Sequence, residues 1–457
     1  MRFYDREEEL AILEGVFLQS QSAMVVISGR RRVGKSRLVD EFLREKDGKK
    51  LLVVPKEEKQ VAADMAESLA DEYAPTFNTI REGFDYFFTK SGSRILYIDE
   101  FSNFLDVNSA IPYEVQRSWE KHKEKTNKIL IFSGSYARMM DTIFTRQKAP
   151  LFNRATQFMI LPPLSFEVTC NIQHEMGIHD PQKQITNYCV FGGIPYYYEL
   201  LERSPDHHVS PETFFFGLGS LAEEGQNILR QEFGKLYKKH FAILEAIGAG
   251  VVSAGEIANR MGIRQTTLSK YLFTLERDFK LIERIVPFGQ NPNRSKKGVY
   301  RIRDNLLAFW FMHVYGKTTP TQHEELNQFV SYRFELLCID YLIQLLQHQK
   351  EKILRSGKWW GNVKVNGKSF EPHEIDLLIE TDKNIYIGEC KWSNAKIGKK
   401  ELAHLQRSAG LFQGRKKIIW VLFSKNGFTI PPEKNLLLFD AKKMASTKKN
   451  RKKASKA

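Results

Sequence analysis

The chain has 457 residues, 42% of them hydrophobic and 12% aromatic, so it can bury several cores, and global disorder is excluded. Its net charge of +15 is uneven, because residues 1–230 sum to −5 and residues 231–457 sum to +20. Four scattered cysteines exclude a disulfide framework and a zinc site, and the apolar runs are too short to cross a membrane. The charged N-terminus lacks the apolar core of a signal peptide, so we expect a cytoplasmic protein.

The first strong signal along the chain is the sequence GRRRVGKS at residues 29–36, which follows an apolar run and precedes a segment of helical spacing. This is G-x-x-x-x-G-K-S between a strand and a helix, where backbone N–H groups cradle phosphates. We expect Lys35 to reach the β- and γ-phosphates and Ser36 to ligate Mg²⁺. The pattern predicts ATP and Mg²⁺ as cofactors, held by Gly29, Arg30, Arg31, Arg32, Val33, Gly34, Lys35, Ser36 and Arg37.

Two further apolar runs end in polar residues that suit the same site. Residues 95–98 read ILYI and are followed by Asp99 and Glu100. We expect Asp99 to hold Mg²⁺, mostly through water, and Glu100 to polarise the attacking water, which indicates hydrolysis. Another apolar run ends at Ser133, which is placed to sense the γ-phosphate or position the water. Because strands and helices alternate over residues 1–165, this region is predicted to form the parallel sheet of a P-loop NTPase.

Residues 166–235 have a helical pattern, interrupted by a Gly-Gly-Ile-Pro turn. Residues 236–303 have the spacing of a winged helix, with helices at 240–248, 254–261 and 266–279 and a hairpin from 281–286 and 298–302. If this unit reads DNA, base edges face Gln265, Thr266, Thr267 and Lys270, and phosphates face Arg294, Lys296 and Lys297. The third helix is not strongly cationic, so the unit fits a docking module as well.

An aromatic-rich helical connector, residues 304–330, leads to an α/β unit at 331–441. There two adjacent strands carry Asp376, Glu389 and Lys391, a D…E-x-K pattern. Asp376 and Glu389 form a hard-cation site, and Lys391 eases the formation of hydroxide at the metal, which is the chemistry of phosphodiester cleavage. Glu335 on the preceding helix is a further candidate carboxylate. The alternative is an ordinary Glu–Lys pair on an exposed strand. The basic tail, residues 442–457, fits either a solubility aid or a non-specific grip on phosphate.

These motifs together resemble a prokaryotic family of AAA+-related ATPases of the STAND class whose C-terminal domain, long called a domain of unknown function, resembles PD-(D/E)XK nucleases. The matching segments are FYDREEEL, GRRRVGKS, LYIDEF, FSGSY, PLFNR, FGGIPYYYE, GKWWG, EIDLLIE and GECKW. The resemblance implies that Arg6 lies near the adenine and that Arg154 touches the γ-phosphate, in cis or across a subunit interface, with Arg138 and Arg146 as rivals. It also implies that Gly192, Gly193 and Pro195 couple the nucleotide state to the helical subdomain.

The sequence thus predicts an α/β chain with a P-loop sheet, a helical subdomain, a winged helix and a restriction-endonuclease-like domain. The hypothesis is an ATP-gated, DNA-associated switch whose last domain cuts nucleic acid. Residues 236–457 would engage nucleic acid, a homo-oligomer is compatible with the pattern, and no membrane is involved. The alternative is an ATP-dependent scaffold or regulator that binds DNA or protein without cleaving it.

Overall fold

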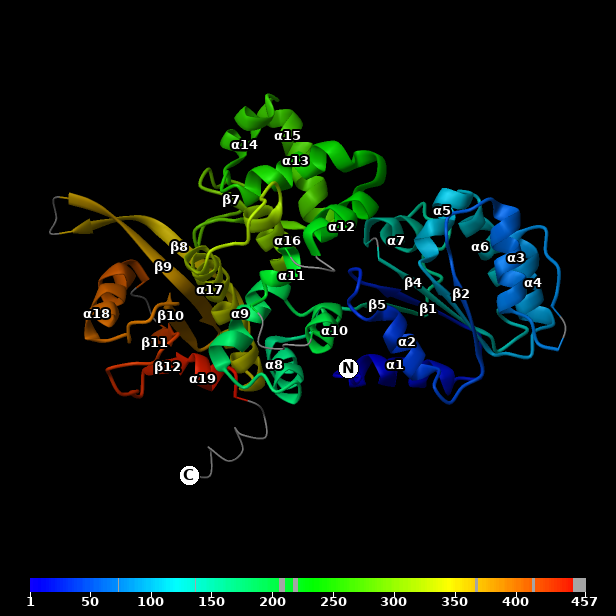
Figure 1. The fold of residues 1–457 in the computed structure, drawn as a ribbon, viewed down its shortest axis with the longest axis horizontal. Helices are drawn as coiled ribbons and strands as arrows, with labels where there is room; N and C mark the ends of the chain where they lie inside the picture. The colour runs from blue at the N-terminus through cyan, green and yellow to red at the C-terminus, as the bar shows by residue number, and fades with distance from the viewer. Residues whose placement is uncertain are drawn as a thin grey trace. The chain divides into compact units, whose positions relative to one another are not determined.

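The structure, a computed structural model, describes residues 1–72, 74–135, 137–204, 210–216, 221–365, 369–412 and 416–446 (Figure 1). The chain divides into two compact units. The first contains Met1–Leu164 together with Ile194–Glu199, and the second contains Ser165–Gly193 and the chain from Leu200 onward. From residue 447 onward the predicted basic tail lies outside the described residues.

The first unit contains a parallel five-stranded sheet in the order β2-β3-β4-β1-β5, as the alternating pattern predicted. The strands are nearly all apolar because helices cover both faces. They are β1 (Ala23–Ser28), β2 (Gly48–Leu52), β3 (Ile95–Asp99), β4 (Ile129–Gly134) and β5 (Gln157–Ile160). Strand β1 lies between β4 and β5. The strands β2, β3 and β4 lie on one side of β1 and β5 lies on the other, so the strand order reverses direction at β1. Ligands of such sheets bind at the carboxyl ends of the strands beside this reversal.

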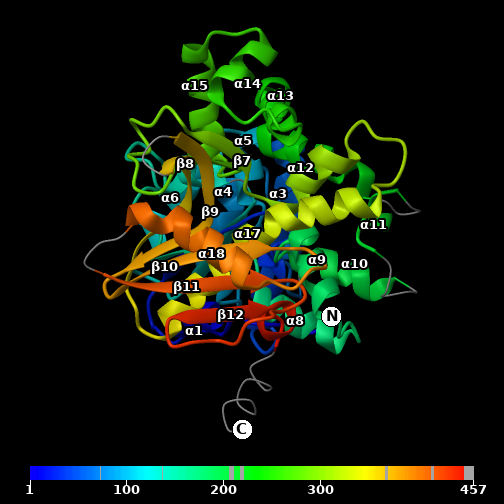
Figure 2. The ribbon, with the colours of Figure 1, turned by 90° about the vertical axis from the view of Figure 1, so that its left-hand side faces the viewer.

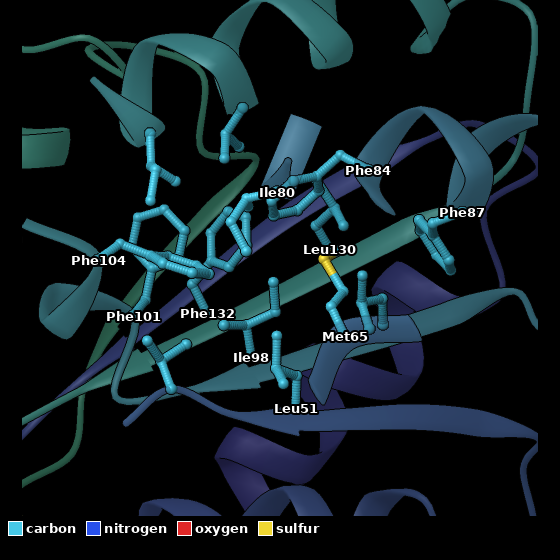
Figure 3. Packing of buried hydrophobic residues seen from close by; sticks show 14 of the residues in the cluster. Leu51, Met65, Ile80, Phe84, Phe87, Ile98, Phe101, Phe104, Leu130 and Phe132 are labelled. Carbon is cyan, nitrogen blue, oxygen red and sulfur yellow. The ribbon is translucent and has the colours of Figure 1, made fainter. Parts of the chain in front are cut away.

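The main core of this unit lies between one face of the sheet and helices that follow β2, β3 and β4 (Figure 3). In that cluster Leu51, Ile98, Leu130 and Phe132 of the sheet pack with side chains such as Phe84. The helices are α1 (Glu7–Phe17), α2 (Lys35–Phe42), α3 (Glu58–Ser68), α4 (Ile80–Thr89), α5 (Phe104–Val107), α6 (Ile111–His122) and α7 (Ala137–Phe144), with a 3₁₀ turn, η1, at Phe101–Asn103. The core fixes the sheet, and with it the polar residues at the strand ends.

The second unit begins with the predicted helical region, in which the Gly-Gly-Ile-Pro turn separates α9 from α10. Gly192 has a φ of 61°, a left-handed conformation that a side chain would strain. The region contains α8 (Phe166–Glu175), α9 (Pro181–Phe191), α10 (Pro195–Arg203), α11 (Thr213–Phe216), η2 (Leu221–Glu223), α12 (Glu224–Phe233) and η3 (Gly234–Leu236). Helix α10 belongs to both units, because its first residues through Glu199 are part of the first unit.

Three helices and a β-hairpin form close to the bounds predicted for the winged helix. Ser253 caps the second helix and shares a capping box with Glu256, and Gly262 ends that helix at a φ of 62°. The elements are α13 (Tyr237–Gly248), α14 (Ala254–Met261), α15 (Gln265–Phe273), a π-helical turn η4 (Thr274–Asp278), and the antiparallel strands β6 (Ile282–Ile285) and β7 (Val299–Ile302). The predicted third helix therefore ends as an α-helix at Phe273 and continues as a π-helical turn.

The C-terminal part of this unit is a mixed five-stranded sheet in the order β12-β11-β10-β9-β8. Leu405 of α18 packs with Ile387 and Leu422 on one face, whereas Tyr341 of α17 contacts Phe423 on the other, and Figure 2 shows α18 in front of the sheet. The elements are α16 (Asn305–Phe309), η5 (Trp310–Val314), α17 (His323–His348), β8 (Ile353–Val365), β9 (Ser369–Thr381), β10 (Asn384–Lys391), α18 (Lys399–Ser408), η6 (Ala409–Phe412), β11 (Lys417–Ser424), β12 (Leu436–Asp440) and α19 (Ala441–Met444).

One helix, α17, runs through the position where the connector was predicted to meet the α/β unit. Buried side chains such as Leu326, Phe329 and Val330 lie before that position, and Phe334 and Leu337 lie after it. The prediction therefore divided one helix between a helical connector and the α/β unit, although its buried positions continue across that boundary without a break.

Candidate functional site

The phosphate-binding loop lies between β1 and α2, where the sequence predicted it. Gly34 at the N-cap of α2 has a φ of 99°, and Arg32 has a φ of 67°, so the loop makes a tight left-handed turn before the helix. At Gly29 a Cβ atom would lie 2.8 Å from the carbonyl oxygen of Leu161. The two glycines are therefore required for different reasons, one for its conformation and one for a close backbone approach.

Lys35 is buried, with 5% of its surface exposed, and its ammonium group is held by three acceptors. Nζ donates to the carbonyl oxygens of Gly29 at 3.0 Å and Arg30 at 3.2 Å, and to Oγ of Ser135 at 2.8 Å. A buried ammonium needs such partners, because its desolvation is otherwise costly. These hydrogen bonds hold the ammonium group of Lys35 at the phosphate-binding loop, where a bound phosphate would contact it.

Asp99 lies opposite Ser36, as predicted. The Ser36 hydroxyl donates to Oδ2 of Asp99 at 2.6 Å, and the Ser133 hydroxyl donates to Oδ1. Ser133 is fully buried and is also hydrogen-bonded to the Tyr97 hydroxyl, so it helps to hold the Asp99 side chain in place. Ser133 still belongs to strand β4, and its hydroxyl faces Asp99 at the end of β3, so its predicted role in sensing the γ-phosphate or positioning the water stays a prediction.

The residue that faces the cavity is Ser135, just past the end of β4. Its hydroxyl donates to Glu100 Oε1 at 2.5 Å, its backbone N–H donates to Oε2 at 3.2 Å, and Lys35 donates to the same hydroxyl. Glu100 sits in a left-handed conformation with a φ of 52°, which directs it away from the strand. Lys35, Ser135 and Glu100 are thus joined in one hydrogen-bonded row beside the phosphate loop.

A cavity of about 450 Å³ opens beside this row, a volume typical of small-molecule sites. Its lining brings together most of the predicted binding residues and adds several that the sequence analysis did not single out. The predicted lining residues are Arg6, Arg31, Arg32, Val33, Gly34, Lys35, Ser36, Arg37 and Glu100, and the additional ones are Met1, Arg2, Phe3, Tyr4, Ser135, Leu164, Tyr196 and Glu199, with Pro195 of the glycine-proline element. Three predicted residues are not part of this lining. Gly29 and Arg30 accept hydrogen bonds from Lys35, and Asp99 accepts one from Ser36.

Two arginines of the site have structural partners. Arg6 is buried and donates to the carbonyl oxygen of Pro162 at 2.5 Å and to Glu9 at 3.1 Å. The guanidinium of Arg32 lies over the ring of Tyr196, 3.9 Å from its centroid. The sequence did contain a signal for Tyr196, since it directly follows Pro195 in the glycine-proline element.

Arg154, implied by the resemblance as the γ-phosphate arginine, is engaged elsewhere in the first unit. Its Nε donates to Glu120 at 2.9 Å and its other guanidinium edge donates to the carbonyl oxygen of Phe152 at 2.8 Å. Arg146 is exposed, and the side chain of Arg138 lies outside the described residues. Within the cavity itself the arginines are those of the phosphate loop and the N-terminal segment.

Replacement of Gly29 by alanine tests the close approach in the loop. The added Cβ would meet a backbone oxygen, which cannot move aside as a flexible side chain can. We expect G29A to weaken the binding of a fluorescent ATP analogue at least tenfold, measured by anisotropy titration. Gly15, where an added Cβ meets nothing within 4 Å, gives the matched control G15A with unchanged affinity.

A second polar cluster lies in the C-terminal sheet. Asp376 and Glu389 are each 8% exposed, and Oδ2 of Asp376 accepts the backbone N–H of Cys390 at 3.0 Å. Lys391 Nζ lies 2.6 Å from Oε1 of Glu389. Burial and the charge of Asp376 raise the pKa of Glu389. Burial alone would lower the pKa of Lys391, but the hydrogen bond and charge of Glu389 and the charge of Asp376 raise it. The three predicted residues therefore share one site.

Glu335 is not brought into contact with that pair, because it forms an ion pair with the buried Lys358 of β8. Within the described part of the chain, no group of three or more His, Cys, Asp or Glu side chains is arranged to hold a metal ion. The side chain of His373 packs against α18, where Nδ1 lies 2.7 Å from Oγ of Ser408 and the ring stacks on His404.

The cations assigned to nucleic acid are exposed on the winged helix. They are Lys270 on α15 and Arg294, Lys296 and Lys297 on the loop between β6 and β7. The guanidinium of Arg284 holds that loop by donating to the carbonyl oxygens of Pro292 and, at 2.7 Å, Ser295. At the base of the loop, Phe288 donates its N–H to Lys358 of β8 at 2.7 Å, so the loop is anchored to the C-terminal sheet within the second unit.

Comparison with protein families and solved structures gives the following likenesses. A family profile described as "ATPase domain predominantly from Archaea" matches residues 3–201, and one described as "Archaea bacterial proteins of unknown function" matches residues 312–404. An uncharacterised protein of Methanocaldococcus jannaschii is 29% identical over 414 residues, which cover 86% of this chain and 88% of that relative.

Among solved structures, the Walker-type ATPase of Pyrococcus abyssi superposes with a TM-score of 0.50 at 16% identity, over 68% of this chain and 96% of that one. The ORC2 protein of Aeropyrum pernix gives a TM-score of 0.44 at 14% identity, over 73% of this chain and 95% of that one. The first of these likenesses shows a shared fold. In the part of the chain that the structure describes, no helix is long and apolar enough to cross a membrane.

Proposed function

We propose that this chain, an ATP-hydrolysing enzyme with an archaeal-type P-loop ATPase domain, is a nucleotide-dependent switch that associates with nucleic acid through its second unit. The observation that carries the nucleotide part is the convergence of Lys35, Ser36, Asp99 and Glu100 at one cavity. In this proposal ATP lies along the phosphate loop, with its base toward the N-terminal segment and its triphosphate toward Lys35.

Each residue of the row has a distinct task in hydrolysis. Lys35 exchanges its contacts with the loop carbonyls for the β- and γ-phosphates, which lowers the cost of the charge that develops there. Glu100 accepts hydrogen bonds in this structure and, beside the γ-phosphate, orients the attacking water and draws its proton. Ser135 links the two, because it accepts from Lys35 and donates to Glu100.

The residues present fit a bound Mg²⁺. Ser36 and Asp99 offer hard oxygen ligands beside the loop, and the serine proton is already directed to the carboxylate, which leaves the serine lone pairs free. Mg²⁺ bound with ATP neutralises charge on the phosphates. Asp99 accepts the Ser36 proton and keeps that hydroxyl oriented toward the loop.

The nucleic-acid part rests on charge and on the arrangement of the second unit. The surplus of +20 lies in residues 231–457, and the exposed cations of the wing stand on a loop that is anchored to the C-terminal sheet. A polyanion is the partner that such a surface attracts. The proposal for the cluster of Asp376, Glu389 and Lys391 is metal-dependent cleavage of a phosphodiester.

To test this function, the pure protein is incubated with supercoiled plasmid and Mn²⁺ or Mg²⁺, with and without ATP, and nicking of the plasmid is measured. Nicking that requires a divalent metal supports the nuclease role, and its dependence on ATP would link the two sites. If no polynucleotide is cut with any metal while ATP is hydrolysed, the cleavage part of the proposal is wrong.

A second candidate function is that of an ATP-dependent scaffold that binds DNA or protein without cutting it. The specific observation in its favour is that Glu335 pairs with Lys358 and so does not join Asp376 and Glu389 at the candidate metal site. In this case the C-terminal unit only binds its partner. Metal ions then change neither the affinity of the protein for a polynucleotide nor the integrity of that polynucleotide.

Removing wing cations tests the contact with phosphate. Each lysine that neutralises a phosphate adds about 0.9 to the slope of log affinity against log salt concentration on duplex DNA. The double variant K296A/K297A is expected to lower that slope by roughly 1.8. The check is fluorescence anisotropy of a labelled duplex at several salt concentrations, with K90A/K125A, which removes two exposed lysines of the first unit, as the control. An unchanged slope would assign the wing to a protein partner.

A further inference from the structure

The ATP site contains a buried tyrosine that the hydrolysis scheme does not use. Tyr97 lies two residues before Asp99 in β3 and is 2% exposed. Its hydroxyl lies 2.9 Å from Oγ of Ser133. Ile95, Leu96 and Ile98 of the same strand are apolar, so a phenylalanine would satisfy the packing of this position equally well. The hydroxyl is therefore the feature that needs an explanation.

The directions of the hydrogen bonds around Asp99 follow from the protons available. The single proton of Ser133 is donated to Oδ1 of Asp99, so the Tyr97 hydroxyl donates to Ser133. Oδ1 also accepts the N–H of Glu100 at 3.0 Å, and Oδ2 accepts the Ser36 hydroxyl at 2.6 Å. A directed line thus runs from Tyr97 through Ser133 to the carboxylate.

We propose that Tyr97 is a positioning residue of the ATP site, which acts through Ser133 to fix the Asp99 carboxylate in the orientation that binds metal–nucleotide. This rests on the proposed function, since it concerns the same site. Without the phenolic donor, Ser133 can turn its proton away from Asp99, and the carboxylate then rotates about its own bond. The Ser36 hydroxyl loses its fixed acceptor, so the response to Mg²⁺ suffers, whereas contacts of the loop with the triphosphate itself persist.

The experiment compares wild type with Y97F, which keeps the ring and removes only the hydroxyl. Binding of a fluorescent ATP analogue is titrated in EDTA and again over a series of Mg²⁺ concentrations. We expect Y97F to leave the affinity in EDTA unchanged and to raise the half-saturating Mg²⁺ concentration about fivefold, the size of effect expected from one neutral hydrogen bond. S133A should behave alike, and the double variant should be no worse than either single one, because both interrupt the same line.

The control is Y86F, which removes a tyrosine hydroxyl elsewhere in the first unit, and it should leave both titrations unchanged. Thermal unfolding establishes that each variant is folded. An equal loss of affinity in EDTA and in Mg²⁺ would assign Tyr97 to packing and overturn the inference. A wild-type Mg²⁺ response retained in full by Y97F would also overturn it, while leaving the ATP site in place. If wild type binds no nucleotide under any condition, the proposed function fails as well.

Discussion

Replacing Glu100 by glutamine is expected to lower the rate of ATP hydrolysis by 10²- to 10⁴-fold, about the contribution of a positioned general base. Glutamine keeps the length of the side chain and can still accept the hydroxyl of Ser135, so the geometry of the row survives. It can no longer draw a proton from water. Release of phosphate at steady state measures the rate, and anisotropy of a fluorescent ATP analogue measures affinity, which should stay within about twofold.

The matched control for this variant is E199Q. Glu199 is another carboxylate that lines the same cavity, but it lies on α10 and not beside the phosphate loop. We expect E199Q to retain most of the hydrolysis rate. A Glu100 variant that hydrolyses ATP at near the normal rate would show that another group activates the water.

Replacing Lys391 by alanine is expected to reduce metal-dependent nicking of plasmid by at least about 100-fold, a loss typical for a group that stabilises charge in the transition state. Lys391 is the cation closest to the carboxylate pair, at 2.6 Å from Glu389. ATP hydrolysis should be unchanged, since the two sites belong to different units. Gel quantification of nicked plasmid in Mn²⁺ gives the rate.

K383A is the control for K391A. Lys383 is an exposed lysine at the turn that joins β9 to β10, at the other end of the same hairpin. Its removal changes the net charge equally and should leave nicking intact. If K383A and K391A lose activity together, the effect is one of overall charge; if neither loses it, the observed nicking has another origin.

The features that depend on short segments could be predicted from the sequence. The phosphate loop, the end of β3, the capped helix at Ser253 and the pairing of Asp376 with Glu389 all follow from patterns within a few residues or between adjacent strands. In each case, backbone geometry alone determines where a side chain points, because strand alternation and helix caps leave few choices.

What could not be predicted depends on packing between distant segments. The choice between Ser133 and Ser135 turns on where β4 ends. Ser133 still lies within the strand and contacts Asp99, whereas Ser135 lies just past it and contacts Lys35 and Glu100. The partners of Arg154 and Glu335 come from other helices and strands, and a local motif carries no information about them. The contact of His373 with Ser408 likewise joins segments that lie far apart in the chain.

Residues 194–199 belong to the first unit, and this determines where the chain can be divided to make fragments or chimaeras. A fragment that stops at the Pro162–Pro163 segment would lack Pro195, Tyr196 and Glu199, and Arg32 would lose the ring that covers it. A crossover at residue 199 would divide α10 in the middle of the helix. The smallest block that a chimaera could exchange intact therefore ends after α10, at about the point where the match to the ATPase profile, residue 201, also ends.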